Sequence, residues 1–204
     1  MLASLPRELL IALRLTLVVA VVTGLIYPFV ITGIAQAVFH DQANGSLISR
    51  NGQVVGSRLI GQEFTKPEYF HGRVSSTVNT NDPSKPQPYN AENSTGSNYG
   101  PSNKALIDRV SKDVQTARKE DGLGPNDQVP VDLVTSDFTG FDPDITEASA
   151  LVQVNRVATA RSLDPARVRA LVERHLQGRI LWIFGEPHVN VLEVNMALDN
   201  REAG

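Results

Sequence analysis

The feature that most constrains this chain is an uncharged segment of 25 residues, from Leu15 to Phe39. As a helix that rises about 1.5 Å per residue, this segment is long enough to cross a hydrocarbon core of about 30 Å with some tilt. Residues 40–204 are polar enough to form one water-soluble domain with its own core. The sequence therefore predicts an N-terminal stretch at 1–14 that includes the start of the helix, a transmembrane helix at 15–39 and a soluble domain at 40–204.

The charges that flank this segment predict its orientation. Arg7 and Arg14 precede it together with one acid, Glu8, whereas the next lysine or arginine after it is Arg50. Because basic flanks are retained in the cytoplasm, we expect a cytoplasmic N-terminus and an extracytoplasmic domain. The alternative is a cleaved signal peptide ending near residues 35–37, but this apolar segment is longer than the usual roughly 7–15 residues.

Four residues inside the segment indicate a packing partner within the membrane. Pro28, which follows Tyr27, removes a helix hydrogen bond and tends to kink the helix. Gly24 and Gly33 provide small surfaces of the kind found where membrane helices pack. We expect these four residues to contact partner helices. The alternative is the ordinary tolerance of glycine and proline in membrane helices.

Composition excludes several classes of function. The formal net charge of −3 and the absence of a basic patch give nucleic-acid binding no electrostatic support. The chain has no cysteine, which excludes disulfides, thiolate catalysis and cysteine-ligated zinc.

Residue patterns predict an α+β fold for the soluble domain. An Asn51-Gly52 pair between β-prone runs indicates a hairpin, and residues 61–102 are expected to form an ordered, irregular surface. Three further strands are predicted at 129–135, 180–184 and 189–194. Helices with polar caps are predicted from Ser102 or Asn103 to Gly122, from Asp144 through Ala158, and from Asp164 to before Gly178.

The sequence contains no recognisable catalytic or metal-binding motif. The histidines, His40, His71, His175 and His188, lack the i, i+4 spacing of a helical metal site, so surface or structural roles are favoured. Neither a nucleophile elbow nor a phosphate-binding loop is present, although a triad assembled from distant residues stays open.

Two charged clusters have competing interpretations. Asp142-Pro143-Asp144 would suit a cation, but a helix cap at Asp144 is favoured. Six arginines have acids interleaved among them, which favours a solvated helical surface over a basic patch. They are Arg156, Arg161, Arg167, Arg169, Arg174 and Arg179.

Taken together and in order, several segments resemble the C subunit of the Kdp-type potassium-transporting P-type ATPase, the KdpC family. The resemblance covers almost the whole chain. The matching segments are 25–28, 32–33, 43–48, 56–62, Phe64, Pro67, 69–73, 96–103, 129–135, 142–143, 156–158 and 185–192. This chain departs from the family's usual pattern at Val74-Ser75-Ser76 and at Asp144, where the family often has histidine.

The resemblance implies a non-catalytic accessory subunit of a four-subunit potassium pump in a bacterial inner membrane. Its partners would be a channel-like potassium-selective subunit, a P-type ATPase subunit, a small stabilising subunit and membrane lipid. ATP and K+ would be handled by those partners, with no cofactor bound directly. The family is described as a chaperone that raises the pump's affinity for ATP. Because the soluble domain is expected outside the cytoplasm, we expect any such effect to be indirect.

The aromatic-rich stretch from Phe64 to Tyr99 is the predicted docking surface outside the membrane. We expect a set of five residues to dock on the channel-like subunit or to frame the approach of potassium, because interface centres favour aromatic residues and arginine. The set is Tyr69, Phe70, Arg73, Asn98 and Tyr99. The alternative is that these rings pack the domain's own core. Two other functions stay open, a membrane-anchored extracytoplasmic hydrolase and a free-standing binding domain.

Overall fold

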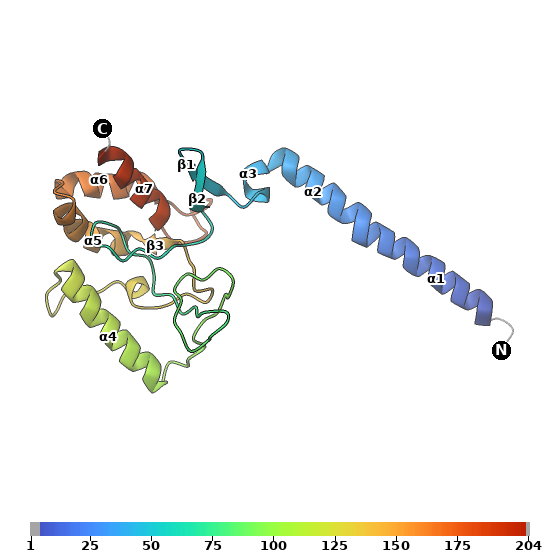
Figure 1. The fold of residues 1–204 in the computed structure, drawn as a ribbon, viewed down its shortest axis with the longest axis horizontal. Helices are drawn as coiled ribbons and strands as arrows, with labels where there is room; N and C mark the ends of the chain where they lie inside the picture. The colour runs from blue at the N-terminus through green and yellow to red at the C-terminus, as the bar shows by residue number, and fades with distance from the viewer. Residues whose placement is uncertain (1–4, 203–204) are drawn as a thin grey trace. The chain divides into compact units, whose positions relative to one another are not determined.

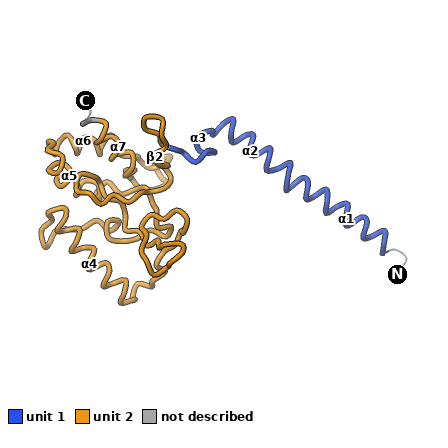
Figure 2. Tube along the Cα trace, viewed as in Figure 1, with its two compact units in different colours: residues 1–47 blue, residues 48–204 orange. Residues whose placement is uncertain are grey.

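In a computed structural model that describes residues 5–202, the chain forms two compact units, residues 1–47 and residues 48–204 (Figure 2). The first unit holds a long apolar helix and the second is a mixed α/β domain (Figure 1). The predicted fold class, one N-terminal apolar helix followed by an α+β domain, is confirmed.

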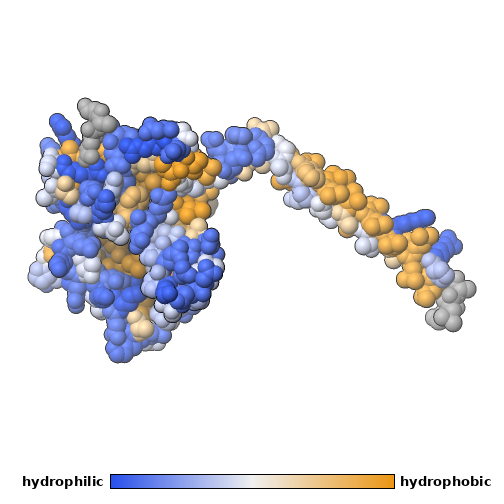
Figure 3. Space-filling model, in the orientation of Figure 1, coloured by the Kyte–Doolittle hydropathy of each residue, from blue (hydrophilic) through white to orange (hydrophobic). Residues whose placement is uncertain are grey.

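Unit 1 is mostly a nearly continuous helix whose described part begins at Leu5. It consists of α1 (Leu5–Val21), the π-helical turn η1 (Val22–Ile26) and α2 (Tyr27–Val38). The 34-residue segment Leu5–Val38 is long and apolar enough to cross a membrane, by length and composition. Apolar side chains dominate the visible face of this helix (Figure 3), and none of them is buried within the chain.

The π turn is a consequence of Pro28. Proline has no amide hydrogen, so the carbonyl of Gly24 lacks its usual partner four residues later. The helical turn before the proline takes in one more residue, so that the amide of Tyr27 donates to the carbonyl of Val22, five residues earlier. The predicted irregularity at the centre of the membrane helix therefore takes the form of a π turn just before the proline.

A hairpin opens unit 2, after the short helix α3 (His40–Ala43). Strands β1 (Leu47–Arg50) and β2 (Gln53–Ser57) are joined by Asn51 and Gly52, whose φ angles of 53° and 77° are both left-handed. Asparagine and glycine tolerate this conformation, which matches the twist of the strands. The predicted hairpin is confirmed.

The core of unit 2 lies between a small sheet and three helices. Its apolar centre is formed by residues such as Ile145, Val154, Leu171 and Val189, all buried. The sheet is antiparallel with the order β3-β5-β4, and Ile145 lies opposite Val189. The elements are β3 (Asp144–Thr146), α5 (Glu147–Ala160), α6 (Pro165–His175), β4 (Leu176–Gln177), β5 (His188–Asn190) and α7 (Val191–Glu202).

Helix α4 (Lys104–Asp121) contacts α5 and has the predicted caps at both ends. The side chain of Asn103 accepts a hydrogen bond from the amide of Ala105 at 2.8 Å, and Gly122 ends the helix with a left-handed φ of 67°. The cap predicted for the third helix is also confirmed, because Asp164 accepts from the amide of Ala166 at 2.8 Å.

Two predictions at the start of the sheet are wrong. Asp144 does not cap a helix. It lies in β3, where it pairs with Asn190 of β5, and Thr146 is the cap of α5. The predicted strand at 129–135 is instead the short 3₁₀ helix η2 (Val131–Leu133). Pro130 precedes this turn and has no amide hydrogen to give to a sheet. Asp132 is buried there and accepts from the amide of Thr146 at 2.7 Å.

Two further strand predictions are wrong near the C-terminus. Within 189–194, the strand ends at Asn190, whose side chain accepts from the amide of Glu193 at 3.1 Å and so caps α7. Valine-rich sequence alone did not indicate that helix. Residues 180–184 form a tight exposed turn closed by a bridge between Ile180 and Phe184, and not a strand of the sheet.

The predicted irregular surface is confirmed between β2 and α4, where side chains hold the backbone in place of a sheet. The hydroxyl of Thr77 donates to the carbonyl of Gln87 at 2.6 Å and accepts from the amide of Asn90 at 3.0 Å. The side chain of Asn90 donates to the carbonyl of Val78 at 2.9 Å. Thr77 and Asn90 are buried, so these bonds act as an internal polar framework.

Candidate functional site

The segment from Pro67 to Arg73, here called the 67–73 segment, lies against α5 and α7 and is held by two buried amide side chains. Gln153 accepts from the amide of His71 at 2.7 Å and donates to its carbonyl at 3.1 Å. Asn195 does the same for Phe70, at 2.8 and 2.9 Å. Both side chains therefore pair with the backbone as a neighbouring strand would.

Two arginines hold the beginning of the same segment. Arg156 donates to the carbonyls of Pro67 and Tyr69, both at 2.8 Å, and forms an ion pair with Asp121 at 2.8 Å. The side chains of Arg156 and Asp121 are 8 % and 5 % exposed, so the charges are mutually compensated inside the domain. Arg161 donates to the carbonyl of Glu68 at 2.6 Å.

Tyr69 sits in a polar and aromatic cluster around Asp199. The guanidinium of Arg161 lies 4.8 Å from the ring centroid of Tyr69, and its Nη2 donates to Asp199 at 2.9 Å. Arg50 also donates to Asp199, at 3.0 Å. Partial burial acts to raise the pKa of Asp199, but the hydrogen bonds from Arg161 and Arg50 outweigh it, and the pKa lies below its ordinary value.

The end of the segment packs against Tyr89. Its hydroxyl donates to the carbonyl of Arg73 at 2.7 Å, and burial raises the pKa of that hydroxyl. A Cβ atom added to Gly72 would lie 2.3 Å from this hydroxyl, and one added to Gly61 would lie 2.6 Å from the ring. Glycine at both positions therefore leaves room for the ring of Tyr89 to pack against the backbone. Arg73 itself forms an ion pair with Asp142 at 3.0 Å.

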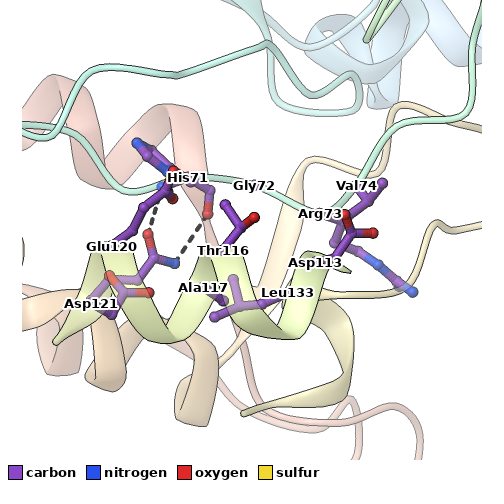
Figure 4. A pocket seen from close by; sticks show the side chains of 11 residues that line it. His71, Gly72, Arg73, Val74, Asp113, Thr116, Ala117, Glu120, Asp121 and Leu133 are labelled. Carbon is purple, nitrogen blue, oxygen red and sulfur yellow. Dashed lines mark hydrogen bonds and ion pairs between the residues drawn. The ribbon is translucent and has the colours of Figure 1, made fainter. Parts of the chain in front are cut away.

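An open pocket of about 170 Å³ lies between this segment and α4 (Figure 4). His71 lies at one end of it beside Glu120, and Arg73 lies at the other end beside Asp113. Burial, then the charge of Arg156, lowers the pKa of His71, against the raising influence of the Lys66 carbonyl and Glu120. The imidazole is therefore poised to stay neutral near pH 7.

The chemistry available in this pocket is limited. Its volume is below the roughly 300–1,000 Å³ of typical small-molecule sites. Among residues 5–202, no three histidine or acidic side chains are grouped as a metal site would require. The contacts of His71 are with the Lys66 carbonyl at 3.0 Å, Arg156 at 3.4 Å and Glu120 at 3.7 Å, an arrangement that supports the segment.

The five residues predicted to dock outside the membrane have different environments. Phe70 is completely buried in the core, so its side chain offers no surface to a partner. Tyr69 and Arg73 are half-buried and are engaged within the domain. Asn98 and Tyr99 are exposed, and Asn98 has a left-handed φ of 53°. The exposed part of the predicted surface is therefore at Asn98 and Tyr99.

The four predicted membrane contacts are all exposed on the helix of unit 1. Gly24 lies inside the π turn, and Tyr27 and Pro28 begin α2. A Cβ added to Gly24 or Gly33 would meet nothing within 4 Å. Packing within the chain therefore does not require glycine at either position.

Sequence reasoning missed the residues that hold the 67–73 segment. Arg156 and Arg161 were interpreted as part of a solvated surface, which is wrong for both, since their side chains are 8 % and 4 % exposed. Gln153 and Asn195 are polar residues inside apolar helical runs, and this pattern was the one sequence signal that they are buried and hydrogen-bonded. Their partners lie 82 and 125 residues away in sequence, beyond any local pattern.

Comparison with known proteins gives a consistent result over both units. The family model described as "KdpC: K+-transporting ATPase, c chain" matches residues 9–200. A protein of Paraburkholderia xenovorans named as a potassium-transporting ATPase KdpC subunit is 51% identical, over 93% of this chain and 95% of its own length. Proteins of the same name from Rhodopseudomonas palustris and Bradyrhizobium diazoefficiens are 52% and 51% identical, over 95% and 97% of this chain and 98% of their own lengths.

Proposed function

The chain belongs to the KdpC family, the c chain of K+-transporting ATPases, and we propose that it is a non-catalytic accessory subunit of such a potassium pump. It would assemble with, and stabilise, a channel-like subunit, a P-type ATPase subunit and a small third subunit. The observation that carries this proposal is the extent of the family match, which includes the apolar helix as well as the domain.

The apolar helix supports assembly within the membrane. Its side chains are exposed in the isolated chain, and Gly24 and Gly33 leave open space on its surface. The π turn next to Pro28 leaves polar backbone groups that neighbouring helices satisfy in membrane proteins. Gly24, Tyr27, Pro28 and Gly33 would therefore seat the helix against a partner.

Asn98 and Tyr99 support a second contact, on the domain. Tyr99 is 47% exposed, and a large ring held at the surface is a common interface anchor. This surface would dock on the outer face of the channel-like subunit or frame the approach of potassium. Tyr69 and Arg73 are half-buried and bonded within the domain, so only their exposed parts would contribute to docking.

The proposed topology makes the effect on ATP indirect. With a cytoplasmic N-terminus, the domain lies across the membrane from cytoplasmic nucleotide. The chain would therefore act on ATP affinity by changing the conformational equilibrium of the ATPase subunit, not by touching the nucleotide. Labelling of Ser84→Cys tests the topology, since the parent chain has no cysteine. Labelling of intact spheroplasts by an impermeant maleimide is expected; labelling only after lysis contradicts the topology.

Co-purification tests the function directly. The tagged full chain, expressed with the other pump subunits, is expected to bring both large membrane subunits through purification in mild detergent. Tyr99→Ala is expected to reduce the recovery of these subunits. Val131→Ala, which also truncates an exposed side chain, is the matched control and is expected to leave the recovery unchanged. A chain that purifies alone and hydrolyses a substrate supports a membrane-anchored hydrolase instead; one that purifies alone and is inert supports a free-standing binding domain.

A further inference from the structure

Five consecutive apolar residues between β4 and β5 stand out from unit 2 into solvent. This apolar tip (residues 180–184) consists of Ile180, Leu181, Trp182, Ile183 and Phe184, which are 71%, 72%, 93%, 72% and 62% exposed. Soluble proteins rarely leave a continuous apolar surface of this kind uncovered, and such surfaces mark sites of interaction. Trp182, at the centre, is the single tryptophan of the chain.

The backbone of the tip is bonded within itself. The amides of Ile180 and Phe184 donate to each other's carbonyls, both at 2.9 Å. The amide of Ile183 donates to the carbonyl of Ile180 at 3.2 Å, and that of Trp182 to the carbonyl of Arg179 at 3.3 Å. Four of the five backbone amides of the tip therefore keep a partner when the tip loses its water.

The base of the tip is closed by an ion pair. Nη2 of Arg179 donates to both carboxylate oxygens of Glu186, at 2.9 and 2.7 Å. The pair joins the two ends of the loop and leaves its base with no net charge. The tip is therefore a small hairpin turn, closed by the backbone bridge between Ile180 and Phe184 with an exposed ion pair at its base.

The conformation of the tip is unusual for its residues. Leu181 and Trp182 have φ angles of 52° and 65°, in the left-handed region that bulky residues rarely adopt. Backbone conformations of this kind persist where the surrounding structure enforces them, and they cluster at binding sites. Here the side chains are exposed, and the backbone bridge between Ile180 and Phe184 is what holds the turn in this conformation.

This arrangement favours a protein pocket over the lipid surface. Partitioning into a bilayer depends on apolar area and is not directional, so it does not require a braced loop in a rare conformation. Anionic lipid attracts basic clusters, but here Glu186 neutralises Arg179. A preformed shape instead lowers the entropic cost of fitting into a complementary pocket.

We propose that the apolar tip inserts into an apolar pocket on another subunit of the same potassium pump, with Trp182 as its central anchor. The proposal rests on the proposed function, because it requires the chain to be a pump subunit. Aromatic residues are enriched and charged residues are depleted at the centres of protein interfaces, which matches the composition of this tip.

The first test uses the full chain expressed with the other pump subunits. Because Trp182 is exposed, Trp182→Ser and Ile183→Ser are expected to leave the melting temperature of the chain alone unchanged. Each is expected to weaken subunit association in mild detergent about tenfold or more. Val131→Ser, at a residue 70% exposed elsewhere in the domain, is the matched control and is expected to assemble like the parent. If both tip variants assemble like the parent, the proposal is wrong.

The second test decides between a protein pocket and the bilayer. The full chain alone is placed in nanodiscs of phosphatidylcholine and phosphatidylglycerol that carry brominated acyl chains, which quench a nearby tryptophan. Emission is expected to stay unquenched, since Trp182 is the chain's single reporter. Strong quenching would overturn the proposal in favour of lipid insertion. If instead the parent chain fails to co-purify with any pump subunit, the proposed function itself fails.

Discussion

The side chain of Asn195 forms both backbone hydrogen bonds of Phe70, accepting from its amide at 2.8 Å and donating to its carbonyl at 2.9 Å. Asn195 is 1% exposed and Phe70 is completely buried, so neither bond is replaced by water if the side chain is removed. One residue of α7 thus fixes the position of a segment that lies 125 residues earlier in the chain.

Replacing this amide is expected to destabilise unit 2 strongly. Asn195→Leu leaves a buried donor and a buried acceptor of Phe70 unpaired, each at a cost of about 1–3 kcal/mol. We therefore expect the free energy of unfolding to fall by about 2–5 kcal/mol, measured by urea denaturation of the full chain in detergent and followed by circular dichroism. Asn126→Ala, at an exposed asparagine, is the control and should change little. Equal stabilities of the two variants would contradict this account.

The contact between Gly72 and Tyr89 predicts a specific interaction between two substitutions. Gly72→Ala places a Cβ 2.3 Å from the Tyr89 hydroxyl, so a loss of about 1–3 kcal/mol is expected in the parent. In a Tyr89→Phe background the hydroxyl is absent and the added loss should be smaller. A double-mutant cycle by thermal or urea unfolding measures the difference.

Gly100→Ala provides the control, because its Cβ would meet nothing within 4 Å and should have little effect. Strictly additive losses at Gly72 and Tyr89 would show that the hydroxyl is not what excludes a side chain there.

His71 predicts how stability depends on pH. Its pKa in the folded domain is lowered, mainly by burial and then by Arg156, so the unfolded chain binds the proton more readily. The stabilising contribution is complete above the ordinary pKa of about 6.5 and is lost as the pH falls through the lower folded pKa. His71→Gln should therefore flatten the fall in unfolding free energy between pH 7.5 and 5. Parallel curves for parent and variant would assign the pH dependence to other groups.

The membrane helix offers a test that separates assembly from folding. Gly24→Leu is expected to reduce co-purification of the partner subunits, because close helix approach needs a small residue. The chain alone should be unaffected, since nothing lies within 4 Å of the added Cβ. Val18→Leu, a similar enlargement of a residue that is already large, is the control. Unchanged assembly and transport in Gly24→Leu would exclude a packing role for this glycine.

Local sequence signals were sufficient for some elements and insufficient for others. Asn51-Gly52, the Asn103 cap with Gly122, and Asp164-Pro165 each act within a few residues, and the elements they predict are present. The Val-rich run after Val189 was misread, because Asn190 both ends a strand and caps α7. Its second role depends on a side-chain bond to Glu193 that residue patterns do not reveal.

The candidate site was predictable only in outline. The aromatic-rich stretch was correctly expected to be ordered, but the groups that hold its 67–73 segment are Gln153, Arg156 and Asn195, far away in sequence. Phe70 illustrates the limit: an aromatic residue in an irregular segment suits an interface and a core equally well, and only the fold places it in the core.

The way in which the 67–73 segment is held has a consequence for biosynthesis. Its partners on α5 and α7 lie 82 to 130 residues from the residues of the segment that they bind, and a fold built on such distant contacts forms slowly. During synthesis the apolar helix emerges first, yet the 67–73 segment does not have all of its native hydrogen-bond partners until Asn195 has been made. The domain is therefore expected to fold only after nearly the whole chain is available, while it is already tethered by its N-terminal helix.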